Sequence, residues 1–175
     1  MTTYVLMAGL PGTGKSTLAK ALASRLEGVV LDKDLVRAAL FPDGATDYTS
    51  EQNDLCVEAM LDAAGYLTAK HATGFIFVDG RTFSRRAQVE RVIAAAETAG
   101  ASWRILHVTC DDAIAEARLA RGSANPAKNR DAALYREVKA RFEPITRARL
   151  DVNSGGEFEE MVTRAAAYLT ADRDQ

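Results

Sequence analysis

A glycine-rich segment near the N-terminus has the residue types and spacing of a phosphate-binding loop. Residues 9–17 match the pattern G-x-x-x-x-G-K-[ST], directly after an apolar run and directly before a helical pattern. Glycines let backbone N–H groups point inward at phosphate oxygens, and the N-terminus of the next helix adds partial positive charge. The segment therefore predicts a nucleotide site formed by Gly9, Leu10, Pro11, Gly12, Thr13, Gly14, Lys15, Ser16 and Thr17.

Three side chains are expected to act on the phosphates and on a magnesium ion. Lys15 should reach the β- and γ-phosphates, and the hydroxyl of Ser16 should join the coordination shell of Mg²⁺. Asp79 closes the apolar run 75–78, where a carboxylate can hold Mg²⁺ directly or through water, or accept a hydrogen bond from Ser16. The alternative for Asp79 is that it only opens a turn with Gly80.

A second group of charged residues follows the second predicted strand. If a helix starts near Lys33, Asp34 and Arg37 form an i, i+3 pair on one of its faces. The carboxylate could take the proton of an attacking hydroxyl, and the guanidinium could hold an anionic or polar part of a substrate. The alternative is that Asp32 caps the helix and the pair is exposed and structural. Asp32 is the better cap and Asp34 the better base, although these roles could be exchanged.

Two further clusters of basic residues are candidates for anion binding. Residues 117–130 contain Arg118, Arg121, Lys128 and Arg130 and no acidic residue, which suggests a hinged lid over about 117–131 that brings guanidinium groups to the transferred phosphate. Cations favoured by a helix C-terminus would explain Arg121 alone.

The other basic cluster follows the third predicted strand. Arg81 and Arg85 could bind an anionic acceptor, as could Arg86. Pairing with Glu90 or with a neighbouring helix is the structural alternative.

The order of the predicted elements places all these residues at one edge of a sheet. Short apolar runs alternate with helical stretches that are too long for hairpins, so the sheet should be mainly parallel with helices on both faces. Ligands of such an α/β fold bind at the carboxyl ends of the strands. The predicted strands are 4–8, 28–31, 75–79, 103–109 and 149–152, and the predicted helices are 15–26, 33–40, 51–73, 84–99, 112–121, 131–142 and 157–170. All the strands but the last are expected to be buried.

Size and charge exclude several classes of protein. The chain has 175 residues, the size of one domain, and 24 acidic against 22 basic residues give a net charge of -2. This balance argues against a protein that coats nucleic acid or an anionic membrane. No apolar run approaches the roughly 20 residues of a membrane span, and two distant cysteines support neither a disulfide framework nor a zinc site. Both cysteines are expected to be buried thiols. We expect a single soluble, cytoplasmic domain over residues 1–175, of unknown oligomeric state.

These motifs together resemble the small P-loop kinases of the nucleoside-monophosphate-kinase-like fold, most closely the AAA_33 group. That group includes the kinase domain of phage polynucleotide kinase and is related to chloramphenicol phosphotransferase and the gluconate kinases. The resemblance implies a three-layer α/β P-loop fold with five strands and a lid, and ATP with Mg²⁺ as cofactors. It spans nearly the whole chain and rests on residues 9–17, 34–37, 78–86 and 118–130.

The resemblance also implies roles for individual residues. It assigns the general base to Asp34, acceptor binding to Arg37 and contacts with the ATP phosphates to Arg118 and Arg121, with Arg130 a weaker match. The adenine would lie near residues 151–155. Family members often carry Asp-Ala-Thr where this chain has Asp-Gly-Arg at 79–81, and the additional arginine hints at a charged acceptor.

The favoured hypothesis is transfer of the γ-phosphate of ATP to a hydroxyl of a small molecule. A 5′-hydroxyl polynucleotide kinase is the alternative with the same chemistry, but the chain lacks a long basic stripe with interleaved aromatic residues. A regulator or slow ATPase that transfers no phosphate is the alternative of another class. It would hydrolyse ATP whether or not an acceptor or Asp34 were present.

Overall fold

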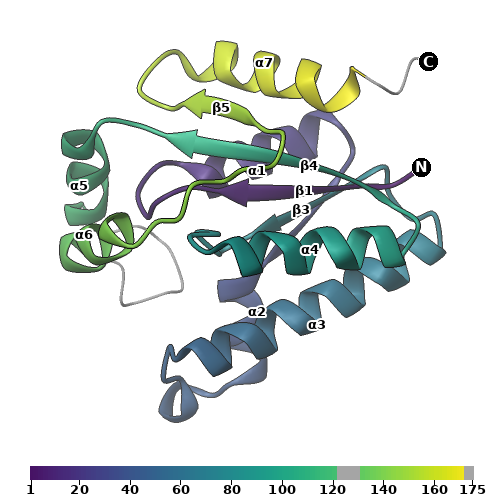
Figure 1. The fold of residues 1–175 in the computed structure, drawn as a ribbon, viewed down its shortest axis with the longest axis horizontal. Coiled ribbons are helices and arrows are strands. Elements are labelled where there is room, and N and C mark those ends of the chain that lie inside the picture. The colour runs from purple at the N-terminus through teal and green to yellow at the C-terminus, as the bar shows by residue number, and fades with distance from the viewer. Residues whose placement is uncertain (122–130, 172–175) are drawn as a thin grey trace.

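Five parallel strands form the sheet of the computed structural model, which describes residues 1–121 and 131–171 (Figure 1). Their spatial order is β2-β3-β1-β4-β5, and all four neighbouring pairs are parallel. The predicted parallel α/β fold is therefore confirmed. The strands are β1 (Thr3–Ala8), β2 (Val29–Asp32), β3 (Phe75–Asp79), β4 (Ser102–Thr109) and β5 (Leu150–Asn153).

Within the described residues, seven helices connect the strands or follow the last of them. Their ends agree with the prediction within two residues, except that the third helix ends four residues earlier than predicted. The fourth begins two residues late, at Arg86, because Phe83 has a positive φ of 53° and Arg85 is extended. The helices are α1 (Lys15–Arg25), α2 (Lys33–Leu40), α3 (Ser50–Ala69), α4 (Arg86–Thr98), α5 (Asp112–Ala120), α6 (Ala132–Ala140) and α7 (Phe158–Thr170), with a 3₁₀ turn at Asp43–Ala45.

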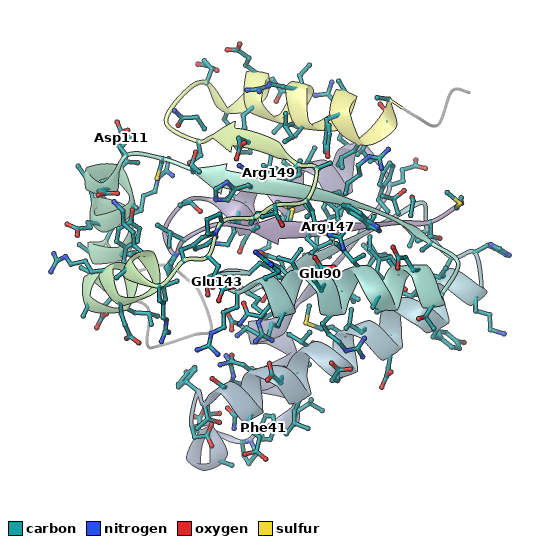
Figure 2. The ribbon with its side chains drawn as sticks, viewed as in Figure 1. Phe41, Glu90, Asp111, Glu143, Arg147 and Arg149 are labelled. Carbon is teal, nitrogen blue, oxygen red and sulfur yellow. The ribbon has the colours of Figure 1, made fainter. Side chains whose placement is uncertain are left out.

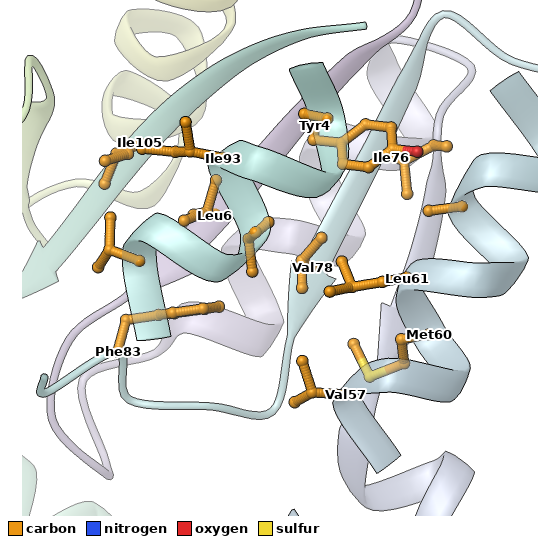
Figure 3. Close-up of a cluster of buried hydrophobic side chains, with 14 of the residues drawn as sticks. Tyr4, Leu6, Val57, Met60, Leu61, Ile76, Val78, Phe83, Ile93 and Ile105 are labelled. Atoms are coloured by element: carbon orange, nitrogen blue, oxygen red, sulfur yellow. The ribbon is translucent and has the colours of Figure 1, made fainter. Parts of the chain in front are cut away.

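The strands alternate their side chains between two hydrophobic cores, one on each face of the sheet. Tyr4 and Leu6 of β1 face the core that α3 and α4 cover, which Figure 3 shows in close-up. Val5 and Met7 face the opposite core, which α1 and α7 cover. This period-two alternation is the geometry of an extended strand. The helices thus lie on both faces of the sheet, as predicted.

The central position of β1 brings three candidate segments together. Since β2, β3 and β1 are neighbours and parallel, the residues that follow their carboxyl ends meet at one edge. Asp32 at the end of β2 pairs in register with Asp79 at the end of β3, and Gly9 directly after β1 donates its N–H to the carbonyl of Thr82 at 3.1 Å. No helix within the described residues has the length and apolar character that crossing a membrane requires.

Two expectations about burial are wrong in detail. We predicted that the second strand is buried, but β2 lies at the edge of the sheet and three of its four residues are only half-buried. Both cysteines were expected to be buried, and Cys56 is, whereas Cys110 is partly exposed because it directly follows the end of β4.

Candidate functional site

The loop between β1 and α1 has a backbone that only glycine can follow at its closest approach to the sheet. Gly9 has a φ of 136°, and a Cβ there would lie 2.2 Å from the carbonyl oxygen of Val108. Gly14, with a φ of 87°, caps α1 in the left-handed region without a side-chain hydrogen bond. The N-terminus of α1 is therefore left without a side-chain acceptor at its cap, as a phosphate site requires.

The side chain of Lys15 folds back onto this loop. Its Nζ donates to the carbonyl oxygen of Leu10 at 2.6 Å, and the hydroxyl of Thr13 donates to the same oxygen at 2.8 Å. The Lys15 side chain is buried although it lies in the first turn of α1. The loop thus holds an ammonium group at the place where the motif predicts contact with the outer phosphates.

Asp79 is a fully buried carboxylate, and neither of its oxygens has a hydrogen-bond partner among the described residues. An isolated buried carboxylate is costly, so this group suits a cation or bound water at the strand end. Gly80 does follow with a positive φ of 83°, but the Asp79 side chain makes no turn hydrogen bond. The described residues contain no cluster of three or more His, Cys, Asp or Glu, and Mg²⁺ in nucleotide sites needs only one or two carboxylates beside phosphates and water.

Asp32 is the N-cap of α2. Its Oδ1 accepts the backbone N–H of Asp34 at 2.9 Å, and α2 begins at Lys33 as predicted. A Cβ at residue 80 would lie 2.8 Å from the same Oδ1, so the glycine in the sequence Asp79-Gly80-Arg81 lets the β3–α4 connection pass close to the cap. The Asp32 carboxylate therefore acts as the cap of α2. The Asp34 side chain has other partners.

Asp34 lies between two cations in a nearly buried cluster. Its Oδ1 accepts from Lys33 Nζ at 2.6 Å and from Arg37 Nη1 at 2.8 Å, and all three side chains are less than a tenth exposed. The predicted i, i+3 pair thus exists, but it is buried, which contradicts the exposed-pair alternative. Two nearby cations favour the ionised form of a carboxylate, the form that can accept a proton.

Two residues of this cluster have no signal in the sequence. Lys33 is one of them, and Asn53 of α3 is the other: its Oδ1 accepts from Lys33 Nζ at 3.0 Å and from Arg37 Nη2. Tyr48, in the loop before α3, lies with its ring 4.9 Å from the Arg37 guanidinium carbon. These contacts depend on how α3 and the loop before it pack on α2, so no local sequence pattern predicts them.

Helix α2 has polar residues on its buried face and two of its leucines exposed. Lys33, Asp34 and Arg37 are buried, whereas Leu35 is 55% and Leu40 is 54% exposed. A helix that only covers a core has the opposite pattern. Half-buried Val36 still packs against the core that α3 and α4 cover, so α2 borders that core and turns its polar face toward a cleft.

That cleft, which we call the cationic cleft, extends from Lys15 to Asp34 and has a volume of about 210 Å³. Arg81 and Arg85 from the β3–α4 connection line it as well. Arg81 pairs with Asp54 of α3 at 2.7 Å, so the alternative of pairing with a neighbouring helix holds for Arg81, whereas Arg85 has no ion-pair partner among the described residues. The suggested pairing with Glu90 is wrong, because Arg147 occupies that carboxylate with two hydrogen bonds of 2.8 and 2.6 Å (Figure 2).

A second cleft, the apolar cleft, lies on the other side of Lys15 and has a volume of about 430 Å³. Arg118 of α5 reaches it, donating to the hydroxyl and the carbonyl of Ser154 at 3.0 and 2.9 Å. Phe158 and Met161 of α7 provide its apolar wall. The structure thus places Arg118 in the apolar cleft and not in the cationic cleft that contains Asp34.

The remaining parts of the predicted lid are only partly described. Arg121 is exposed at the end of α5 and lines neither cleft. Lys128 and Arg130 lie in the segment 122–130, outside the described residues. The two stems of that segment, α5 and α6, are joined by Asp112, which accepts from the Tyr135 hydroxyl at 2.7 Å and from Lys139 Nζ.

The junction of α5 and α6 should weaken in acid. The hydrogen bonds from Lys139 and Tyr135 lower the pKa of Asp112 below its ordinary value of about 3.9, and burial opposes them only weakly. A group with a lowered pKa in the folded state stabilises the protein above its unfolded-state pKa and loses this contribution as the pH falls through the folded-state value. The Asp112→Asn variant should therefore unfold at a lower urea concentration than wild type at pH 7, and the difference should shrink below about pH 4.

Asp111→Asn is the matched control, because the neighbouring Asp111 makes no side-chain capping bond to α5. A difference between wild type and Asp112→Asn that does not depend on pH would contradict the assignment of this stability to the ionised carboxylate.

Comparisons with known proteins agree with this geometry. A family model named AAA_33 and described as an AAA domain matches residues 5–145, and no curated protein matches the sequence. A sugar kinase from Janibacter sp. HTCC2649 aligns with 98% of this chain and 96% of its own at a TM-score of 0.73 and 14% identity. A gluconokinase from Sinorhizobium meliloti 1021 aligns with 97% and 92% at 0.71 and 15% identity.

A third solved structure contains ligands. It is the APS kinase of Mycobacterium tuberculosis in complex with AMPPNP and APS, which aligns with 98% of this chain and 98% of its own at a TM-score of 0.67 and 15% identity. At such identities the likeness establishes the fold. All three proteins are P-loop kinases, and the chain has their fold.

Proposed function

The chain belongs to the AAA_33 family, and from this premise we propose that it is an ATP-dependent phosphotransferase acting on a hydroxyl group of a small molecule. The observation that supports the proposal most is the position of Lys15, which lines both clefts. The apolar cleft on one side suits a nucleoside, and the cationic cleft on the other side contains a buried carboxylate. A phosphoryl group bound beside Lys15 would lie between donor and acceptor.

The nucleotide would occupy the phosphate loop and the apolar cleft. Backbone N–H groups of the loop, apart from those of Gly9 and Pro11, would bind its phosphates, and the base would pack against Phe158 and Met161 near Arg118. Ser16 and Asp79 would hold Mg²⁺, since Ser16 is in the first turn of α1 and Asp79 is a buried carboxylate with no other partner among the described residues. When bound, the ion neutralises charge on the phosphate oxygens.

Asp34 would act as the general base. As the acceptor oxygen forms its bond to the γ-phosphorus, the proton of that hydroxyl moves to an Asp34 oxygen and the bond from the γ-phosphorus to the departing ADP oxygen breaks. Lys33 and Arg37 keep Asp34 ionised and fix its orientation by hydrogen bonds of 2.6 and 2.8 Å. Arg37, Arg81 and Arg85 line the space left for the acceptor.

Arg118 is expected to contribute more to ATP binding than to the transfer step. Its guanidinium is engaged with Ser154 beside the apolar cleft, so Arg118→Ala should raise the KM for ATP by about tenfold with a smaller change in kcat. Steady-state kinetics at varied ATP would measure this, with Arg136→Ala, an exposed arginine of the neighbouring helix α6, as the control. A loss of kcat of about 10²-fold at saturating ATP would instead assign Arg118 to the transferred phosphate.

The test of the proposed function is mass spectrometry of a small-metabolite extract incubated with ATP, Mg²⁺ and either wild type or Asp34→Asn. A 5′-hydroxyl oligonucleotide is added to the same pool, and Asp43→Asn, an exposed carboxylate of the 3₁₀ turn, is the matched control. A new phosphorylated small molecule that requires Asp34 but not Asp43 supports the proposal. A phosphorylated oligonucleotide supports the polynucleotide kinase instead. ATP hydrolysis without any modified acceptor, equal in wild type and Asp34→Asn, supports the regulator.

A further inference from the structure

The cationic cleft has more positive charge than phosphate binding by one lysine requires. Among the described residues its lining contains a single carboxylate, Asp34, while the chain as a whole has a net charge of -2. Counting the ion-pair partners Asp54 and Glu137 as well gives three negative groups, half the number of the positive ones. The positive side chains of the lining are Lys15, Lys33, Arg37, Arg81, Arg85 and Arg141.

Two of these cations come from the β3–α4 connection and not from the phosphate loop. Arg81 is directed toward α3, because its Nη2 lies 2.7 Å from Asp54 Oδ1. Arg85 is the N-cap of α4 and is exposed. Neither belongs to the loop that precedes α1 or to the apolar cleft. Their charge is therefore available to whatever molecule enters the cleft opposite ATP.

The pairing of Arg81 is one that a ligand can replace. The Arg81 side chain is 13% exposed, but that of Asp54 is 61% exposed, so the carboxylate can return to water when another anion takes its place. Exposed ion pairs contribute little, whereas an arginine binds a phosphate or carboxylate with two parallel hydrogen bonds. Deeper in the cleft, Arg37 is buried and its Nε has no partner among the described residues.

We propose that the acceptor carries an oxyanion group in addition to the hydroxyl that is phosphorylated, and that Arg81 and Arg85 bind this group together with Arg37. The inference rests on the proposed function and adds the substrate class: a phosphorylated, sulfated or carboxylated small-molecule alcohol. Because Arg37 also touches Asp34 at 2.8 Å, an anion on the other side of its guanidinium lies within about 8 Å of the base. The hydroxyl and the anionic group are thus only a few bonds apart in the acceptor.

The first experiment separates this inference from the proposed function. A metabolite extract is passed through a membrane that retains polynucleotides, and the filtrate is divided by anion exchange at neutral pH into bound and unbound fractions. The retained polynucleotides and the two fractions are each incubated with wild type, Mg²⁺ and ATP labelled at the γ-phosphate. We expect labelled product from the bound fraction only. Product from the unbound fraction alone would overturn the inference and leave the kinase intact, and product from the retained polynucleotides alone would overturn the small-molecule acceptor. No product from any fraction would overturn both proposals.

Treating the bound fraction with alkaline phosphatase before the assay identifies the oxyanion. Loss of acceptor activity indicates a phosphate monoester, and retention indicates a carboxylate or sulfate. Either result is compatible with the inference, since both groups bind arginine in the same way.

The second experiment tests the arginines themselves with the active fraction. Arg81→Gln and Arg85→Gln should each raise the KM for the acceptor by about tenfold or more, with the KM for ATP changed by less than about twofold. Arg91→Gln is the matched control, because Arg91 lies on α4 and is exposed but does not line the cationic cleft. Arg85 is exposed, so its replacement should leave the unfolding temperature unchanged. An unchanged acceptor KM in both variants would overturn the assignment, as would an equal rise in the ATP KM.

Discussion

Replacing Asp34 with Asn is expected to lower the rate of phosphoryl transfer by about 10²-fold or more while leaving ATP binding intact. Asparagine has nearly the same shape but cannot take the proton of the acceptor hydroxyl. ATP binding should persist because Asp34 lies in the cationic cleft and not in the apolar cleft. Single-turnover transfer to the acceptor and a separate titration with an ATP analogue would measure the two effects.

The same replacement should also lower stability. Lys33 and Arg37 would lose the charge between them in a nearly buried cluster, and breaking such a cluster costs roughly 3 kcal/mol or more. Rates must therefore be expressed per mole of protein that binds nucleotide.

Asp32→Asn is the matched control for the catalytic effect. Asparagine caps helices as well as aspartate does, so the bond to the N–H of Asp34 should survive and transfer should be nearly normal. If Asp32→Asn were the slow variant and Asp34→Asn nearly normal, the general base would be Asp32. Normal turnover in both variants would mean that no carboxylate of α2 acts as the base.

Replacing Lys15 with Ala is expected to reduce transfer by about 10³-fold or more, to a level close to background. The ammonium group is the only cation of the phosphate loop, and under the proposed function it would lie where negative charge is redistributed between the β- and γ-phosphates during transfer. Release of labelled product under single-turnover conditions is the appropriate measurement. Folding should be affected only modestly, by about 1 kcal/mol, since the alanine removes a hydrogen bond whose acceptor, the Leu10 carbonyl, keeps the hydroxyl of Thr13.

Lys20→Ala provides the control on the same helix. Lys20 is exposed in the middle of α1, so its replacement removes the same charge without touching the loop. Equal losses in the Lys15 and Lys20 variants would indicate a general electrostatic effect. Near-normal transfer in Lys15→Ala would place the transferred phosphate outside the loop.

Local patterns were sufficient for much of the fold. Apolar runs that alternate with helices of more than two turns permit only parallel pairing, because no short connection can return the chain. The motif of residues 9–17 predicted both the strand before it and the helix after it, and Asp32 signalled the start of α2 through ordinary capping chemistry. Errors occurred where tertiary contacts override propensity, as at the start of α4, where the backbone N–H of Arg86 donates to a carboxyl oxygen of Glu143 at 2.7 Å.

The sequence by itself therefore determined the order of the elements, the phosphate loop and the i, i+3 spacing of Asp34 and Arg37, since each depends on residues close along the chain. Only the tertiary structure decided which way α2 faces. Helical periodicity defines a stripe of side chains but not what covers it, and here α3 covers the polar stripe through Asn53. The same holds for Arg118, whose partner Ser154 follows a different strand and is brought near by the parallel pairing of β4 with β5.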